Sequence, residues 1–169
     1  MQNQTLYHFT SEHHLWGIGK HGLTVGDVPT DIHRMKGLVG VWLTSSPLPA
    51  NHGLGGSAVD KSRYRLTVSL ALPNLHKWTE WAAKHVAAET ISALHATAPD
   101  FDTWYIFLGI IRPESILECV DMASGSHVEN WREIKTTRSE ELEVPAWRRA
   151  AWQKRMMKDV IRALRRQAI

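Results

Sequence analysis

The sequence predicts an α+β domain, because stretches with the two-residue period of a strand and stretches with the period of a helix follow one another along the chain. Hydrophobic residues make up 43% of its 169 residues and charged residues 22%, which suits one globular domain with a core of normal size. Strand-like alternation is clearest at 63–70, and helix-like spacing is clearest at 146–169. We expect residues 1–122 to carry the main fold and residues 123–169 to add a polar connector and a basic C-terminal helix.

The chain opens on a pattern typical of a strand, a tight turn and a helix. Thr5 to Thr10 predicts a strand, and Ser11 can cap a helix that runs from Glu12 to about Lys20. Gly22 follows at the position where a glycine commonly ends a helix. We therefore expect the first helix to pack back against the first strand.

The middle of the chain predicts a loop, two strands and two helical runs. Thr24 to Gly37 contains a proline and two glycines and has no period, so we expect a loop. Leu38 to Ser45 is apolar and predicts a buried strand, and Arg63 to Leu70 alternates like a half-buried strand. Helical spacing follows at Leu75 to His85 and at Ala88 to Ala98.

The last third of the chain predicts two more strands and one long helix. Thr103 to Leu108 and Ile116 to Val120 have the composition of strands, whereas Gly125 to Glu143 is polar and weakly patterned. The final helix has apolar residues on one face and basic residues on the other. We expect its apolar face to dock on the sheet or its flanking helices; an independent arm that binds a partner is the alternative.

The net charge of +3 is unevenly distributed. Residues Ala146 to Ile169 hold eight Lys or Arg and one acid, whereas the rest of the chain holds 12 basic and 16 acidic residues. Such asymmetry favours an anionic partner for the helix Trp147 to Ile169, either a nucleic acid or an acidic protein surface.

Several classes of protein and site lack support in the sequence. No basic stretch precedes an apolar run near the N-terminus, so we expect neither a signal peptide nor a membrane span, and a cytoplasmic location. The single cysteine, Cys119, can close no intramolecular disulfide and is expected to be a buried thiol. The ten histidines form no zinc-ligand motif, so we expect no metal site.

Two segments carry the main functional signal. The first is Tyr7-His8-Phe9-Thr10, followed by a helical run and then His21-Gly22-Leu23; the second is Val41-Trp42-Leu43-Thr44-Ser45. Together they resemble the two NAD-binding motifs of the ADP-ribosyltransferase superfamily, in its diphtheria-toxin-like and poly(ADP-ribose) polymerase branches. The resemblance implies a split, mostly antiparallel sheet over about residues 4–122, and NAD as the substrate.

The resemblance also implies roles for individual residues. His8 would bond the adenosine ribose of NAD, and the backbone of Phe9 would hold the nicotinamide carboxamide. Trp42 stands at a tyrosine position of the family and would stack on the nicotinamide. Three hydroxyl side chains, those of Thr10, Thr44 and Ser45, could complete the polar lining.

The third motif of the family is a carboxylate on a later strand, which stabilises an oxocarbenium-like transition state. The corresponding stretch here runs from Phe101 to Pro113 and has no glutamate at the start of its strand. Asp102 is the nearest carboxylate and our candidate for the catalytic acid, with Glu114 second. Arg63 and Arg65 are candidate ligands for the pyrophosphate, because a guanidinium can donate paired hydrogen bonds to phosphate oxygens, and they are also the arginines that an RNA 2′-phosphotransferase would need.

Each of these residues also has a structural interpretation. His8 can be a hydrogen-bonded core histidine, Trp42 a core residue and Arg65 an exposed one, while Trp78 and Trp81 are expected to be helix packing. The sequence therefore favours an NAD-dependent ADP-ribosyltransferase that modifies a protein or nucleic acid, with an effector or toxin role by analogy. The alternatives are a non-catalytic binding module with a degenerate NAD site and an RNA 2′-phosphotransferase.

Overall fold

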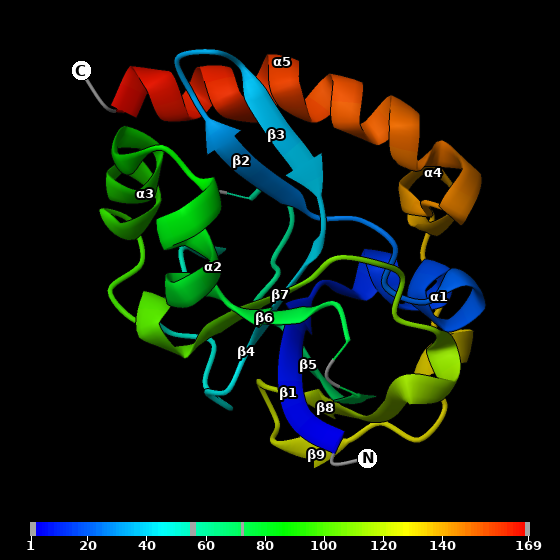
Figure 1. Ribbon diagram of the computed structural model, residues 1–169. Coiled ribbons are helices and arrows are strands. Elements are labelled where there is room, and N and C mark those ends of the chain that lie inside the picture. Colours follow the sequence, from blue (N-terminus) through cyan, green and yellow to red (C-terminus); the bar gives the residue numbers. More distant parts are fainter. Residues whose placement is uncertain (1–2, 55–56, 72, 168–169) are drawn as a thin grey trace.

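The computed structural model describes residues 3–54, 57–71 and 73–167, which form an α+β fold (Figure 1). A seven-stranded antiparallel sheet lies at its centre, with helices around it and a long C-terminal helix, as the sequence predicted in outline. The end of the predicted C-terminal helix, Ala168 and Ile169, lies outside the described residues. No helix within the described ranges is long and apolar enough to cross a membrane.

The central strand is β1 (Asn3–Thr10), in the order β6-β7-β4-β1-β5-β8-β9. It pairs along its whole length with β5, from Asn3 opposite Ala71 to Thr10 opposite Tyr64. The remaining strands of this sheet are β4 (Val41–Thr44), β5 (Tyr64–Ala71), β6 (Leu75–Lys77), β7 (Trp104–Phe107), β8 (Ile116–Asp121) and β9 (Ser126–His127). The predicted strands at Thr5–Thr10, 63–70, Thr103–Leu108 and Ile116–Val120 are confirmed.

One face of the sheet packs against α1 (Glu12–His21). Leu6, Leu66 and Val68 are fully buried on this face and contact Leu15 and Ile18 of the helix. α1 ends at Gly22, whose φ of 79° is in the region that favours glycine. Ser11 occupies the N-cap position as predicted, but its hydroxyl lies 2.7 Å from Nδ1 of His14 and caps no backbone amide.

The opposite face carries a cluster of tryptophans beneath α2 (Trp78–His85). Trp42 of β4 and Trp104 of β7 point toward Trp78 and Trp81, with the Trp42 and Trp78 rings 4.8 Å apart. The predicted packing role of Trp78 and Trp81 is confirmed. The sequence pattern placed Leu75 on this helix, but Leu75 belongs to β6 and the helix begins at Trp78.

Two buried indole N–H groups in this cluster donate to histidine rings. Trp78 Nε1 donates to His95 Nε2 at 2.9 Å, and Trp104 Nε1 donates to His52 Nδ1 at 3.0 Å. His95 ends α3 (Ala88–His95), and its ring stacks on that of Phe101 in the short turn η2 (Phe101–Thr103) at 3.5 Å. These contacts join α2, α3 and the start of β7 through ring nitrogens that act as acceptors.

The prediction of a loop over Thr24 to Gly37 is wrong. The segment contains β2 (Asp27–Asp31) and the start of β3 (Lys36–Val39), which form a separate antiparallel hairpin. The predicted single strand Leu38 to Ser45 is also divided, because Gly40 lies between β3 and β4 and its amide donates to the Gly26 carbonyl. The hairpin is held by tertiary contacts, since Val28 and Ile32 are fully buried against other elements.

The C-terminal helix α5 (Arg149–Gln167) docks on this hairpin and on α3, which confirms the predicted docking (Figure 1). Met156 and Ile161 are fully buried in the contact with Ile32 and Ala93. Trp147, which the sequence placed on the apolar face, lies before the helix in η5 (Ala146–Arg148) and is 78% exposed.

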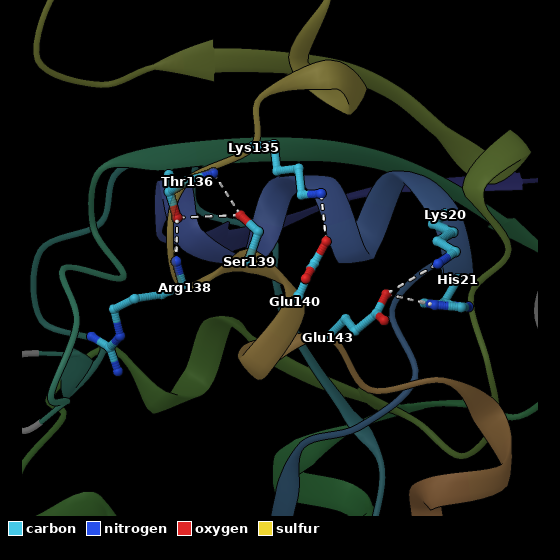
Figure 2. A network of polar contacts seen from close by, with 8 residues as sticks. All are labelled: Lys20, His21, Lys135, Thr136, Arg138, Ser139, Glu140 and Glu143. Carbon is cyan, nitrogen blue, oxygen red and sulfur yellow. Dashed lines mark hydrogen bonds and ion pairs between the residues drawn. The ribbon is translucent and has the colours of Figure 1, made fainter.

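The polar connector packs on α1 through η4 (Trp131–Glu133) and α4 (Ser139–Leu142). Figure 2 shows the polar contacts that hold it: Glu143 Oε2 lies 3.0 Å from His21 Nε2 and 3.5 Å from Lys20 Nζ. Ser139 is fully buried, and its hydroxyl accepts the amide N–H of Thr136. Cys119 on β8 is buried, as predicted, and burial raises the pKa of its thiol to about 12.

Replacing Ile161 by alanine is expected to lower the free energy of unfolding by about 2–5 kcal/mol, because it opens a cavity between α5 and the hairpin. Urea unfolding followed by circular dichroism measures this change. Leu117→Ala is the control, since Leu117 is 63% exposed and its truncation should change the stability by less than about 0.5 kcal/mol. Equal stability of the two variants would mean that α5 does not fold cooperatively with the rest.

Gly22→Ala is expected to destabilise the protein more than Gly125→Ala. Both glycines have positive φ, 79° and 72°, which strains an alanine by about 1–2 kcal/mol, and Gly22 also has a ψ of −167°, a combination that is essentially restricted to glycine. A Cβ on Gly22 would also overlap the carbonyl oxygen of Ile111, whereas one on Gly125 would meet open space. Thermal unfolding of the two variants measures the difference, and similar losses would contradict the close approach at Gly22.

Candidate functional site

The three segments singled out by the sequence lie on three adjacent strands. β4 lies between β7 and β1, with Tyr7 opposite Thr44 on one side and Trp104 opposite Thr44 on the other. The segments are far apart in the sequence, and the sheet brings them side by side at its centre. β6 lies beyond β7 and β5 lies beyond β1, so the three site strands are flanked by other strands on both sides.

His8 holds β4 against β1. Its Nδ1 donates to the backbone carbonyl of Trp42 at 2.9 Å, which fixes the neutral ring with its proton on Nδ1. Burial lowers the pKa of His8 to about 4, and the nearby charge of Lys61 acts in the same direction, against the hydrogen bond. His8 is therefore uncharged at neutral pH, and its free Nε2 can only accept.

His14 lies close to His8 and behaves in the same way. Burial lowers the pKa of His14 to about 4, and the charges of Lys61 and His8 also contribute. Nδ1 of His14 lies 2.7 Å from the Ser11 hydroxyl. A small cavity of about 120 Å³ opens beside these residues, lined by Ser11, Glu12, His13, Asp60 and Arg63.

The side chains of His8 and Trp42 point to opposite faces of the sheet. Side chains alternate along a strand, so His8 shares the face of the buried Leu6, whereas Phe9 shares the face of Tyr7. Tyr7 pairs with Thr44, so Thr44 and Trp42 lie on that second face. Phe9, Trp42 and Thr44 therefore share one face, and His8 and Thr10 share the other.

Trp42 is part of the tryptophan cluster. Its ring centroid lies 4.8 Å from that of Trp78 and 5.3 Å from that of Trp104, and its Nε1 donates to the Asp27 carbonyl at 2.7 Å. Its donor and much of its ring surface are thus occupied by the protein itself. Trp42 therefore has the packing role that the sequence offered as the alternative to stacking on nicotinamide.

A row of hydroxyl groups lies where β4 ends and β7 begins. Thr44 Oγ1 lies 2.8 Å from Thr103 Oγ1, and the Ser45 amide donates to the Thr103 carbonyl at 2.9 Å. Ser45 and Asp102 are both exposed, and Asp102 directly precedes Thr103 in the chain, where its charge acts on His95. The structure therefore places Thr44 and Ser45 beside Thr103, the residue that follows Asp102.

Arg65 lies on the face of Phe9 and Tyr7. Its guanidinium lies over the Tyr7 ring, 4.9 Å from the centroid, and Nη1 donates to the Pro47 carbonyl at 3.1 Å. Arg63, the other arginine considered for a phosphate, forms an ion pair with Asp121 at 2.8 Å. Arg65 is thus the better placed of the two, because its guanidinium has no carboxylate partner among the described residues.

A cavity with a volume of about 680 Å³ lies next to this face. It is lined by residues of the loop after β4 and of the turn after α3: Pro49, Ala50, Asn51, His52, Gly53, Leu54, Ser57, Ala58, Val59, Asp60, Ser62, Thr97 and Pro99. None of the residues predicted from the sequence lines it. Phe9 reaches it indirectly, because its ring stacks on His52 with centroids 6.0 Å apart.

His52 is the residue that the sequence analysis missed. Its ring lies between Phe9, the Trp104 indole and the cavity, and burial lowers its pKa. The sequence around it contains several glycines after a buried strand, which is typical of a loop beside a site. Nothing in that pattern distinguishes His52 from the other nine histidines.

Stability is expected to fall as the pH decreases from 6.5 toward 4. His8 and His14 have pKa values near 4 when folded and near 6.5 when unfolded, so the unfolded chain binds more protons in this window. Their contribution is complete above pH 6.5 and is lost below it. Urea unfolding across this window should show a weaker pH dependence in His14→Gln than in the parent protein. The exposed His33 provides the control His33→Gln, and equal pH dependence in both variants would contradict this origin.

Comparison of the chain with protein-family models, with curated proteins and with solved structures gives no match.

Proposed function

We propose that this chain is a divergent member of the ADP-ribosyltransferase superfamily, which transfers ADP-ribose from NAD to a macromolecular acceptor. The observation that carries the proposal is the meeting of the second and third motif segments at one end of the sheet. There the hydroxyls of Thr44 and Thr103 are in contact, and Asp102, which directly precedes Thr103, is exposed. The proposal includes a split sheet of the superfamily type.

The proposed NAD site uses the face that carries Phe9 and Arg65. A dinucleotide requires aromatic surface, hydroxyl-directed hydrogen bonds and a cation for its pyrophosphate. Phe9, Thr44 and Arg65 supply these groups on one face, with Ser45 just beyond the end of β4, and the cavity of about 680 Å³ beside His52 is within the size range of ligand pockets. His8 lies on the opposite face of the sheet. It would contribute indirectly, because its hydrogen bond to the Trp42 carbonyl fixes the position of that backbone.

In the proposed reaction the bond between nicotinamide and its ribose breaks, nicotinamide leaves with the bonding electrons, and an acceptor nucleophile bonds to the ribose carbon. The positive charge that develops on the ribose is stabilised by a negative group. Asp102 supplies that charge in this proposal. The acceptor gives up its proton as the new bond forms.

Asp102→Asn is expected to reduce nicotinamide release from NAD by about 10²–10³-fold, because it removes the charge that stabilises the transition state. The assay measures nicotinamide released by the purified protein, with and without cell lysate as a source of acceptor. Asp159→Asn is the control, since Asp159 is also exposed and lies on α5. Unchanged release in Asp102→Asn would exclude Asp102 as the acid.

Arg65→Gln is expected to weaken NAD binding by roughly 10-fold, through loss of a charge-assisted contact to the pyrophosphate. Titration calorimetry with NAD measures the dissociation constant. Arg63→Gln is the matched control, because Arg63 precedes the same strand and is already paired with Asp121. Equal affinity in Arg65→Gln and the parent protein would contradict the proposed site.

A second function is favoured by a specific observation. Among the described residues, no carboxylate hydrogen-bonds to His8, Thr44 or Ser45, and the Trp42 ring is packed in the core. These facts favour a non-catalytic binding module that keeps the fold and has lost the reaction. Absence of both nicotinamide release and NAD binding in the parent protein would select this function. The RNA 2′-phosphotransferase alternative loses support, because the ion pair with Asp121 occupies Arg63.

A further inference from the structure

The outward face of α5 is a line of basic side chains. Six are exposed: Lys154, Arg155, Lys158, Arg162, Arg165 and Arg166. At 100° per residue they fall within an arc of about 120°, opposite the face that carries Met156 and Met157. We call these six residues the basic stripe.

Within the described part of the chain the basic stripe forms no ion pair, although burial raises the pKa of Asp27 and the charge of Arg155 acts to lower it. Among the described residues, no lysine or arginine of α5 lies within ion-pair distance of a carboxylate. The helix itself contains one acid, Asp159. Arg155 lies over the Trp152 ring at 3.9 Å, and Arg165 makes a long contact with the sulfur of Met35 at 3.8 Å. Neither contact removes positive charge from the surface.

The spacing of the basic stripe produces repulsion between like charges, which destabilises the helix in the free protein. Lys154, Lys158, Arg162 and Arg166 follow one another at intervals of four residues, so each lies beside the next on the helix surface. Like charges at this spacing destabilise a helix. An anion that runs parallel to the helix would relieve this repulsion along its whole length, whereas a single small anion would relieve it at one point.

The length of the basic stripe fits the backbone of a nucleic acid. From Lys154 to Arg166 the helix rises about 18 Å, which corresponds to about five nucleotides of one strand at 3.4 Å each. An anionic membrane surface fits less well. Amphipathic helices bind membranes by burying their apolar face, and here Met156 and Ile161 are already buried against the hairpin and α3.

We propose that the basic stripe of α5 binds the phosphate backbone of a nucleic acid without reading its sequence. This inference goes beyond the proposed transfer of ADP-ribose and does not depend on it. The six residues of the stripe offer charge but no aromatic ring for base stacking, and the neighbouring Trp152 ring is covered by Arg155 and donates its N–H to Asp27. Affinity therefore comes from counterion release and falls steeply with salt.

The test compares two triple charge reversals in the full chain. The first, Lys154→Glu with Lys158→Glu and Arg162→Glu, reverses the centre of the basic stripe. Fluorescence anisotropy with labelled duplex DNA and with labelled single-stranded RNA, each about 20 nucleotides long, measures affinity from about 50 to 200 mM salt. Affinity should fall at least about tenfold, and the salt dependence for the duplex should lose a slope of about 3.

The matched control is Lys77→Glu with Lys84→Glu and Arg112→Glu. These three residues are exposed on other elements, and their reversal changes the net charge by the same amount. The control variant should keep the affinity and salt slope of the parent protein. Circular dichroism of both variants verifies that they fold, and the neutral variant with glutamine at 154, 158 and 162 replaces the first if it does not.

The outcomes separate the proposal from its rivals. Loss of binding confined to the stripe variant supports it, and comparison of the two probes then shows whether duplex or single strand is preferred. Equal loss in both variants would show a general effect of net charge and overturn it. Binding to neither probe would also overturn it, as would tighter binding to phosphatidylserine vesicles than to both nucleic acids. None of these readouts involves NAD, so failure here leaves the enzymatic proposal to its own assays.

Discussion

Asp27 joins three parts of the molecule through two hydrogen bonds. Its backbone carbonyl accepts the Trp42 indole N–H at 2.7 Å, and its carboxylate accepts the Trp152 indole N–H at 2.6 Å. Because a buried indole donor without an acceptor is costly, the packing of Trp42 in the tryptophan cluster requires β2 to begin where it does. The same residue then fixes α5 on the hairpin. Central sheet, hairpin and C-terminal helix thus meet at one residue at the start of β2, whose two hydrogen bonds add to the apolar contacts between them.

The fold could be predicted where local pattern and tertiary environment agree. β5 was evident because Tyr64, Leu66 and Val68 alternate with polar residues, and in the structure they face the core. The hairpin was missed because its strands are short, contain Pro29 and Gly37, and owe their stability to burial of Val28 and Ile32 by distant elements. Contacts between residues far apart in the sequence produce no local sequence pattern. The predicted start of the helix at Leu75 was wrong for a related reason, since Leu75 pairs with Phe107 in a strand and the helix begins at Trp78.

The candidate site was predictable in its strands but less so in its side chains. The two motif segments were expected to act together, and β1 and β4 are indeed neighbours. Which face each side chain occupies depends on the pairing of Tyr7 with Thr44, and register between distant strands cannot be inferred from either strand alone. The bonds of the His8 ring to the Trp42 carbonyl and of the Trp42 indole to Asp27 depend on the same register. Docking of α5, by contrast, was evident from its helical spacing, because its apolar residues needed a partner surface.

The two histidines that accept indole N–H groups make the tryptophan core sensitive to acid. Burial lowers the pKa values of both His52 and His95, so both rings gain their protons at a lower pH than an exposed histidine does. Once protonated, each ring nitrogen becomes a donor and can no longer accept from Trp104 or Trp78. Imidazolium also quenches indole emission on contact. The intrinsic fluorescence of this chain, with its eight tryptophans, therefore reports the protonation of its own interior, without any added dye.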